Sequence, residues 1–223
     1  MSTVTKMRLS KETYNILKNF ASINSNILIK TGNVLKTVST GMNIYAEATV
    51  AEDFDVDVPI WDLNKFLGVV SMFNNPDLEF NDNYVVISSG RSSVTYYYSE
   101  PSLLTVPTKS IKMSIPVVEF ELDEKDLNDI LKASSILQVS DLRITAADGK
   151  VCITVDDVNQ SNSNNFKIEI ETDQITKELD VTINVSEIKF IPGSYNVSLT
   201  DGIASKFTHK TFDLSYYIAV KRG

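Results

Sequence analysis

The octapeptide KETYNILK occupies residues 11–18, and a close variant, KDLNDILK, occupies residues 125–132. Both begin and end with lysine, and both place Asn or Asp, then Ile and Leu, before the last lysine. They lie 125 − 11 = 114 residues apart, about half of the 223-residue chain. An octapeptide repeated once in each half predicts two similar domains of about 110 residues each.

Hydrophobic periodicity predicts a helix around each octapeptide. In the first, Ser10 is a good N-terminal cap, and Ile16, Leu17 and Phe20 recur at helical spacing. The second predicted helix covers residues 123–138 and has the same apolar spacing.

The lysines of each octapeptide share one helix face. Lys11 and Lys18 are nearly two turns apart, about 10 Å along the axis, and lie opposite the apolar residues. Lys125 and Lys132 repeat this arrangement. Two interpretations remain open: a solvated surface, which is the usual place for helical lysines, or contact with a polyanion. Neighbouring acids such as Glu12 weaken a simple basic patch.

A second helix is predicted in each half. IWDLNKFLGVVSMF, residues 60–73, is followed by Asn-Asn-Pro, and SEIKFI, residues 186–191, is followed by Pro-Gly. An offset of 189 − 65 = 124 residues aligns Lys65 with Lys189. Alternating apolar runs such as FDVDV (54–58) predict strands elsewhere, so the fold class is α+β.

A connector divides the two halves. Residues 99–116 contain three prolines and no helical period, which predicts an extended segment. The predicted domains are residues 1–108 and 109–223.

Composition limits the class of protein. A net charge of −8 argues against coating nucleic acid by charge alone, although local basic stripes remain possible. The single cysteine, Cys152, excludes an internal disulfide, fits a reducing cytoplasm and is expected to be a buried thiol in the run KVCITV. No signal-like segment and no run of 18 apolar residues is present, so we expect no membrane association.

No catalytic constellation is visible. The only histidine, His209, lacks triad partners in the sequence around it and is interpreted as a structural or a surface residue, and no phosphate-binding glycine motif occurs. Asp53, Asp55 and Asp57 form a D-x-D-x-D run, but the Gly and Glu that a calcium loop requires are missing. Because the three aspartates alternate with apolar residues, they are interpreted as the solvent-exposed face of a strand. We therefore predict a non-enzymatic protein without catalytic residues, metal or cofactor; a metal enzyme using these three carboxylates is a weak rival.

Four segments resemble one family. They are RLSKETYNILKNFASINSNILIKTG (8–32), YAEATVAEDFDVDVPIWDLNKFLGVVSMFNN (45–75), GRSSV (90–94) and INVSEIKFIPGSY (183–195). Together they resemble the sliding clamps of T-even-like tailed bacteriophages. The resemblance spans most of the chain and is weakest at residues 139–180 and after residue 205.

The resemblance implies the DNA-clamp fold, with two similar domains per subunit and three subunits in a ring. Helices would line the ring interior and antiparallel sheets would form the outside. Duplex DNA, bound by encirclement without sequence specificity, would then face these residues: Lys11, Lys18, Lys65, Arg91, Lys125, Lys132 and Lys189.

The resemblance also implies partners in the cytoplasm of an infected bacterium. They are DNA polymerase, an ATP-driven clamp loader and, because related phage clamps serve transcription, transcription factors. Short C-terminal peptides of partners would enter an apolar pocket near the connector, for which the candidates are Leu103, Leu104, Val106 and Ile218. Ordinary packing between the domains is the other interpretation of these four residues. An acidic β-rich scaffold that does not encircle DNA is the alternative function.

Overall fold

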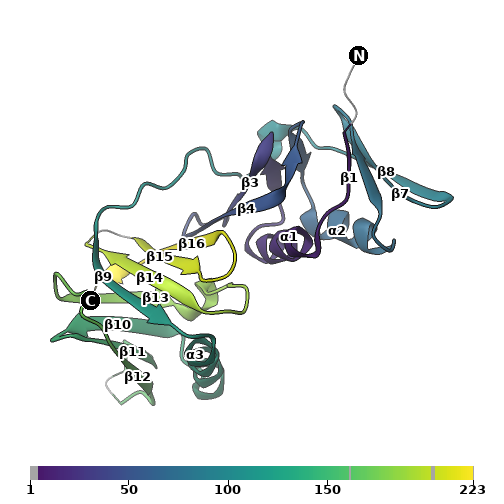
Figure 1. Cartoon of the computed structure of the whole chain (residues 1–223). Coiled ribbons are helices and arrows are strands. Elements are labelled where there is room, and N and C mark those ends of the chain that lie inside the picture. Colours follow the sequence, from purple (N-terminus) through teal and green to yellow (C-terminus); the bar gives the residue numbers. More distant parts are fainter. Residues whose placement is uncertain (1–4, 161, 202–203, 223) are drawn as a thin grey trace. The chain divides into compact units, whose positions relative to one another are not determined.

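The computed structural model describes residues 5–160, 162–201 and 204–222. The chain divides into two compact units, Met1–Lys109 (unit 1) and Ser110–Gly223 (unit 2). The predicted domain boundary lies one residue earlier, after residue 108. Each unit combines antiparallel strands with few helices (Figure 1). Within the described ranges, no helix is long and apolar enough to span a membrane.

Unit 1 contains a four-stranded antiparallel sheet, two further strand pairs and two α-helices. The sheet has the order β1 (Thr5–Met7), β6 (Asp77–Phe80), β7 (Tyr84–Ser89), β8 (Ser92–Tyr97). The pairs are β2 (Ile27–Ile29) with β5 (Val58–Ile60), and β3 (Gly32–Val38) with β4 (Ile44–Phe54). The helices are α1 (Lys11–Ile23) and α2 (Leu63–Ser71), and a 3-10 turn, η1, covers Pro101–Leu103.

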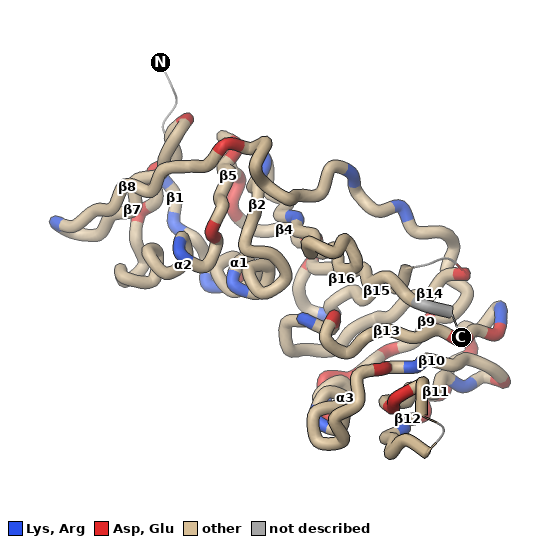
Figure 2. Tube along the Cα trace, turned by 180° about the vertical axis from the view of Figure 1, so that it is seen from behind, with Lys and Arg blue, Asp and Glu red and all other residues tan. Residues whose placement is uncertain are grey.

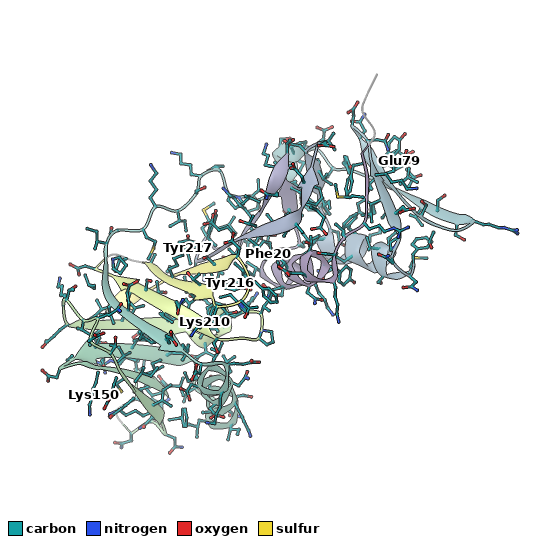
Figure 3. All side chains as sticks on the ribbon, viewed as in Figure 1. Phe20, Glu79, Lys150, Lys210, Tyr216 and Tyr217 are labelled. Atoms are coloured by element: carbon teal, nitrogen blue, oxygen red, sulfur yellow. The ribbon has the colours of Figure 1, made fainter. Side chains whose placement is uncertain are left out.

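Aromatic side chains fill the core of unit 1. Phe20, labelled in Figure 3, lies on the buried side of α1 and is 0% exposed. Phe54 and Phe80 meet edge to face, with ring centroids 5.6 Å apart. The helix predicted around the first octapeptide is therefore held by an apolar face buried against strands, which is what its period indicated.

The second helix of unit 1 is shorter than the predicted 60–73. Ile60 belongs to β5, and the Asp62 side chain accepts a hydrogen bond from the Lys65 N–H at 2.9 Å. This cap fixes the start of α2 at Leu63. The strand predicted at 54–58 is also wrong in part, because β4 ends at Phe54 and residues 55–57 form a bend before β5.

Unit 2 contains a five-stranded antiparallel sheet, a second group of four strands and one α-helix. The five-stranded sheet has the order β12 (Phe166–Glu171), β11 (Lys150–Asp156), β10 (Asp141–Ala147), β13 (Leu179–Asn184), β17 (Lys221–Arg222). The other strands run β16 (Leu214–Ala219), β15 (Ala204–His209), β14 (Tyr195–Thr200), β9 (Pro116–Leu122). The helix is α3 (Glu124–Leu137), close to the predicted 123–138.

The helix predicted at residues 186–191 is absent. Only a 3-10 turn, η2 (Val185–Glu187), forms, and Ile188 leaves the helical region with φ −81° and ψ 78°. Pro192 disfavours helical geometry in the residue before it. Too few residues then remain to nucleate an α-helix, which must order a full turn before its first hydrogen bond.

The side chain of Phe190 packs into unit 2 from this non-helical segment. Its ring lies 5.1 Å from Tyr195, 4.8 Å from Phe207 and 4.6 Å from Tyr216, measured between centroids. Aromatic packing of this kind stabilises the segment without helical hydrogen bonds.

Cys152 is only partly buried, which corrects the prediction of a buried thiol. Val151, Ile153 and Val155 are the residues of β11 that face the core. Since side chains alternate along a strand, Cys152 is in the opposite phase and lies on the outer face of the sheet.

Candidate nucleic-acid interface and connector pocket

The N-terminus of α1 is capped from two directions. The Ser10 hydroxyl accepts a hydrogen bond from the Thr13 N–H at 3.1 Å. From β4, the Glu52 carboxylate accepts hydrogen bonds from the Ser10 N–H and the Thr13 hydroxyl. A carboxylate at this end of a helix also complements the helix dipole. The orientation of α1 is thereby fixed against β4.

Three lysines lie on two neighbouring helices of unit 1. Lys11 and Lys18 are exposed on α1, and Lys65 is exposed on α2. The helices are joined by the Tyr14 hydroxyl, which donates to the Leu67 carbonyl at 3.4 Å. Figure 2 marks lysine and arginine positions on both helices. Among the residues that the structure describes, no carboxylate forms an ion pair with any of these three lysines.

The corresponding face of α3 carries less positive charge. Lys125 forms an ion pair with Asp129 one turn away, at 2.8 Å, and this hydrogen bond raises the pKa of the lysine. Lys132 is exposed nearer the end of the helix. The helix contains two lysines against three carboxylates, Glu124, Asp126 and Asp129, so its charge is −1, whereas α1 carries two lysines against Glu12.

Two further predicted contacts lie off these helices. Lys189 is exposed and follows η2, so it occupies an irregular segment rather than a helix. Arg91 is exposed in the turn between β7 and β8. Figure 1 shows this hairpin projecting away from α1 and α2, so the structure does not bring Arg91 together with the helix lysines of its unit.

The four predicted partner residues have different environments. Leu103 lies in η1 with 62% of its surface exposed, and Leu104 and Val106 are half-buried in the connector. Ile218 is fully buried in β16, with 0% exposed.

Val106 lines a pocket of about 270 Å³ in unit 1. Its apolar lining also comes from Leu28, Val34 and Pro107, and Lys30 and Lys36 supply positive charge. Sequence reasoning missed the residues from β2 and β3 because they lie about 70 or more positions from Val106 and Pro107. The only signal for them was the apolar alternation of their strands, which does not reveal what covers them.

The bend after β4 reaches the rim of this pocket. The Asp57 carboxylate accepts hydrogen bonds from the Lys30 ammonium and the Thr31 N–H, both at 2.9 Å. The hydrogen bond from Lys30 holds the pKa of Asp57 below its usual value. Asp57 therefore supports the turn between β2 and β3. In the described part of the chain, no group of three His, Cys, Asp or Glu side chains could hold a metal ion.

Both halves of the chain match family models. A model described as DNA polymerase processivity factor matches residues 10–105, and one described as gp45 sliding clamp, C terminal, matches residues 119–222.

Sliding clamps of two phages are similar to this chain over most of its length. The chain is 34% identical to the sliding clamp of Escherichia phage RB69 over 225 residues, which covers 96% of this chain and 97% of that protein. It is 34% identical to the sliding clamp of Enterobacteria phage T4 over 199 residues, covering 86% and 87%.

Solved structures show the same fold at low identity. The Proliferating Cellular Nuclear Antigen of Entamoeba histolytica gives a TM-score of 0.72 at 11% identity and covers 99% of this chain and 100% of that one. The A. fulgidus PCNA, in a structure with the C-terminal region of FEN-1, gives a TM-score of 0.75 at 10% identity, covering 99% of both chains.

The expected sliding-clamp fold with two similar domains is thereby confirmed. Family models account for both halves, and the phage relatives align with the chain over most of their length. The chain belongs to the sliding-clamp family of DNA polymerase processivity factors.

Proposed function

We propose that this chain is the replicative sliding clamp of a bacteriophage, and that three copies close into a ring around duplex DNA. The ring tethers the phage DNA polymerase for processive synthesis in the infected cell. The protein is not an enzyme, and a separate ATP-dependent loader opens and closes it. Transcription factors are a further class of partner.

The carrying observation is the pair of neighbouring helices in unit 1. Their exposed faces present Lys11, Lys18 and Lys65 among small or polar residues: Asn15, Ser22, Asn64, Gly68 and Ser71. No bidentate arginine or protruding aromatic side chain lies among these residues, so the faces suit backbone contact rather than base reading.

Weak, evenly spread positive charge suits a protein that must move along DNA. Duplex DNA carries one negative charge per about 1.7 Å of axis, and dense phosphate pairing would hold the protein in place. Three subunits together carry 3 × (−8) = −24. Retention therefore comes from enclosure, while the acidic exterior suppresses adsorption to other nucleic acid.

Two open strand edges support ring closure. β8 ends the sheet of unit 1 and β12 ends the five-stranded sheet of unit 2, and each strand has six residues. Unpaired edges of matched length allow head-to-tail strand pairing between copies, and a rotation that closes gives a ring.

The connector pocket supports polymerase binding. Its lining by Leu28, Val34, Val106 and Pro107 suits an apolar side chain, and Lys36 suits the terminal carboxylate of a peptide. We assign this pocket to C-terminal peptides of the polymerase and other partners, with Leu103 and Leu104 adjoining it in sequence. Ile218 is buried, so we do not assign it to the pocket; it packs in the core and supports the neighbouring strands.

Absolute mass and DNA retention test the proposal together. Light scattering should give about 3 × 24.9 ≈ 75 kDa at high protein concentration. After loading, the protein should stay on closed circular DNA and leave linear DNA of the same length from its ends. A species of 24.9 kDa that stays monomeric as concentration rises would contradict the ring and favour the scaffold alternative.

A further inference from the structure

Two buried asparagines hold one residue of the connector. Asn24 is 5% exposed and Asn26 is 7% exposed. The Asn24 Nδ2 donates to the Thr105 carbonyl at 2.8 Å, and the Asn26 Oδ1 accepts from the Thr105 N–H at 3.2 Å. Both backbone groups of Thr105 are therefore bonded to side chains of unit 1.

This arrangement replaces a missing strand partner. Thr105 lies outside every strand, so no sheet ladder satisfies its peptide groups. One hydrogen bond would leave the connector free to rotate about it, whereas two bonds in opposite senses fix both position and orientation. Removing either amide leaves a shielded peptide group unpaired, which is unfavourable.

The same asparagines are anchored to the ends of both helices. The Asn24 N–H caps α1 by donating to the Phe20 carbonyl at 2.9 Å. The Asn26 Nδ2 donates at 2.7 Å to the carbonyl of Trp61, which directly precedes the cap of α2. The Asn24 Oδ1 accepts from the Asn26 N–H at 2.9 Å and links the two residues.

The connector pocket begins at the next residue. Val106 and Pro107 follow Thr105 directly and line the pocket together with Leu28 and Val34. Because consecutive Cα atoms are about 3.8 Å apart, Val106 stays close to the position at which the two hydrogen bonds hold Thr105. The position of this wall thus depends on two side chains that do not line the pocket.

We propose that Asn24 and Asn26 are positioning residues for the connector pocket. They fix the connector at Thr105, so that the pocket is formed before a partner arrives and lies at a set distance from α1 and α2. A preformed pocket lowers the entropic cost of binding. The identity of the bound partner, a polymerase peptide, rests on the proposed function; the holding of the connector does not.

Substitutions separate the side-chain contacts from general stability. Asn24→Ala and Asn26→Ala each remove one bond to Thr105. Thr105→Ala is the matched control, because both bonds use backbone atoms that this change leaves in place. Asn81→Ala is a second control, since the Asn81 Nδ2 also donates to a backbone carbonyl, that of Glu79 at 3.1 Å, in the same unit.

Hydrogen exchange at the Thr105 amide, followed by NMR, measures directly how firmly the connector is held. We expect Asn26→Ala to raise its exchange rate roughly tenfold or more, and Asn24→Ala to raise it too, while amides of β2 and β3 keep their protection. Thr105→Ala and Asn81→Ala should leave it unchanged. A Thr105 amide that stays equally protected in both asparagine variants would overturn the proposal.

Binding of the phage DNA polymerase to the full-length clamp tests whether the two asparagines affect partner binding at the connector pocket. Both asparagine variants should bind about tenfold more weakly, mainly through faster dissociation. Thr105→Pro removes the N–H that donates to the Asn26 Oδ1 and keeps the carbonyl that accepts from Asn24, and Leu104 has ψ 138°, which suits a following proline. It should weaken binding as Asn26→Ala does; binding equal to that of Thr105→Ala would overturn the positioning role. A wild-type clamp that does not bind polymerase contradicts the proposed function, and the exchange result still decides whether the asparagines hold the connector.

Discussion

At the scale of single residues, His209 shows how one side chain organises its surroundings. Its Nδ1 accepts hydrogen bonds from the Thr211 N–H at 3.0 Å and the Phe212 N–H at 3.1 Å. The Nε2 atom lies 3.3 Å from the Pro192 carbonyl. Because Nδ1 accepts, Nε2 carries the proton and donates to Pro192. His209 is 6% exposed, so of the two interpretations, a structural or a surface residue, the buried structural one fits.

Gly193 is required beside this ring. A Cβ atom there would lie 2.2 Å from the His209 Nε2, and its φ of +151° disfavours other residues. We predict that Gly193→Ala lowers the free energy of unfolding by roughly 2–4 kcal/mol through clash and backbone strain. Urea unfolding measures the loss.

Gly68 is the matched control for this prediction. It lies in α2, and a Cβ there would meet nothing within 4 Å. Gly68→Ala should raise the free energy of unfolding by up to about 1 kcal/mol, because Ala has the higher helix propensity. Equal effects of the two substitutions would contradict the assigned role of Gly193.

An ion pair predicts acid sensitivity. The Arg143 guanidinium hydrogen-bonds both carboxylate oxygens of Asp180 and holds the pKa of Asp180 below its usual value. A lowered folded-state pKa gives stability that is present above the unfolded pKa, near 3.9, and is lost as pH falls through the folded pKa.

Asp180→Asn should therefore make the unfolding free energy fall less steeply below about pH 4. Since the two side chains are 45% and 35% exposed, the cost at neutral pH should be at most about 1 kcal/mol. Unfolding curves at pH 7 and in the acid range test this. An unchanged acid slope would remove the pair from the pH response.

At the scale of elements, equivalent helices differ in charge although their sequences match. The octapeptide lysines predicted two equal faces, but Asp129 pairs with Lys125 on α3, while the lysines of α1 have no such partner among the described residues. Sequence spacing placed the lysines correctly on exposed faces. It did not show which of them pair with a neighbouring carboxylate, since that depends on side-chain rotamers.

Charge reversal on the helices should impair DNA retention. We predict that Lys18→Glu with Lys132→Glu leaves folding and assembly intact and shortens the lifetime of the clamp on circular DNA several-fold, because two positive charges per subunit are replaced by two negative charges facing the polyanion. The measurement is the loaded fraction over time.

The matched control carries the same charge change at two residues outside the helices. Lys150 lies away from α3 (Figure 3), and Lys177 forms an exposed ion pair with Asp201. Lys150→Glu with Lys177→Glu should retain DNA like the wild type. If both double variants lose DNA equally, net charge and not the helix face explains the effect.

The open edge of β8 is the part of unit 1 that we expect to pair with a neighbouring subunit. In the β7–β8 hairpin, Ser89 pairs with Ser92 across a two-residue turn, and the Tyr98 N–H donates to the Asn83 carbonyl at 3.0 Å. This alternation directs the Thr95 N–H to the open edge of β8. Thr95→Pro therefore removes an edge donor without breaking a bond inside the sheet.

Thr95→Pro should weaken trimer formation, seen by light scattering as a shift from about 75 kDa toward 24.9 kDa, with the thermal unfolding of the subunit little changed. Thr95→Val keeps the N–H and should remain trimeric. Full assembly of the proline variant would exclude this edge of β8 from the subunit interface.

At the scale of the whole molecule, binding by phosphate contacts and retention by enclosure predict different dependences on salt. A protein held by phosphate contacts loses affinity steeply as salt rises. The proposed closed ring, with a charge of −8 per subunit, would be held by topology instead. We predict that retention on closed circular DNA changes little between 50 and 200 mM salt, roughly the range over which phosphate-bound proteins dissociate. Linearising the DNA should release the clamp at every salt concentration; release from circles that follows salt would contradict enclosure.

The sequence by itself determined the two-part organisation, the α+β class and the positions of α1 and α3. These features follow from local apolar period and from a repeated octapeptide, and both are carried by residues close together in the chain. Longer family-like segments added the clamp fold, and the similarity of both halves to one family established it.

Only the tertiary structure decided three points. The segment after Asn184 is anchored without helical hydrogen bonds because Phe190 packs among Tyr195, Phe207 and Tyr216. The connector pocket exists because residues 28–36 meet residues 106–107. Asn24 and Asn26 hold Thr105 across about 80 positions of chain. Each of these depends on contacts between distant residues, and local propensity carries no information about such contacts.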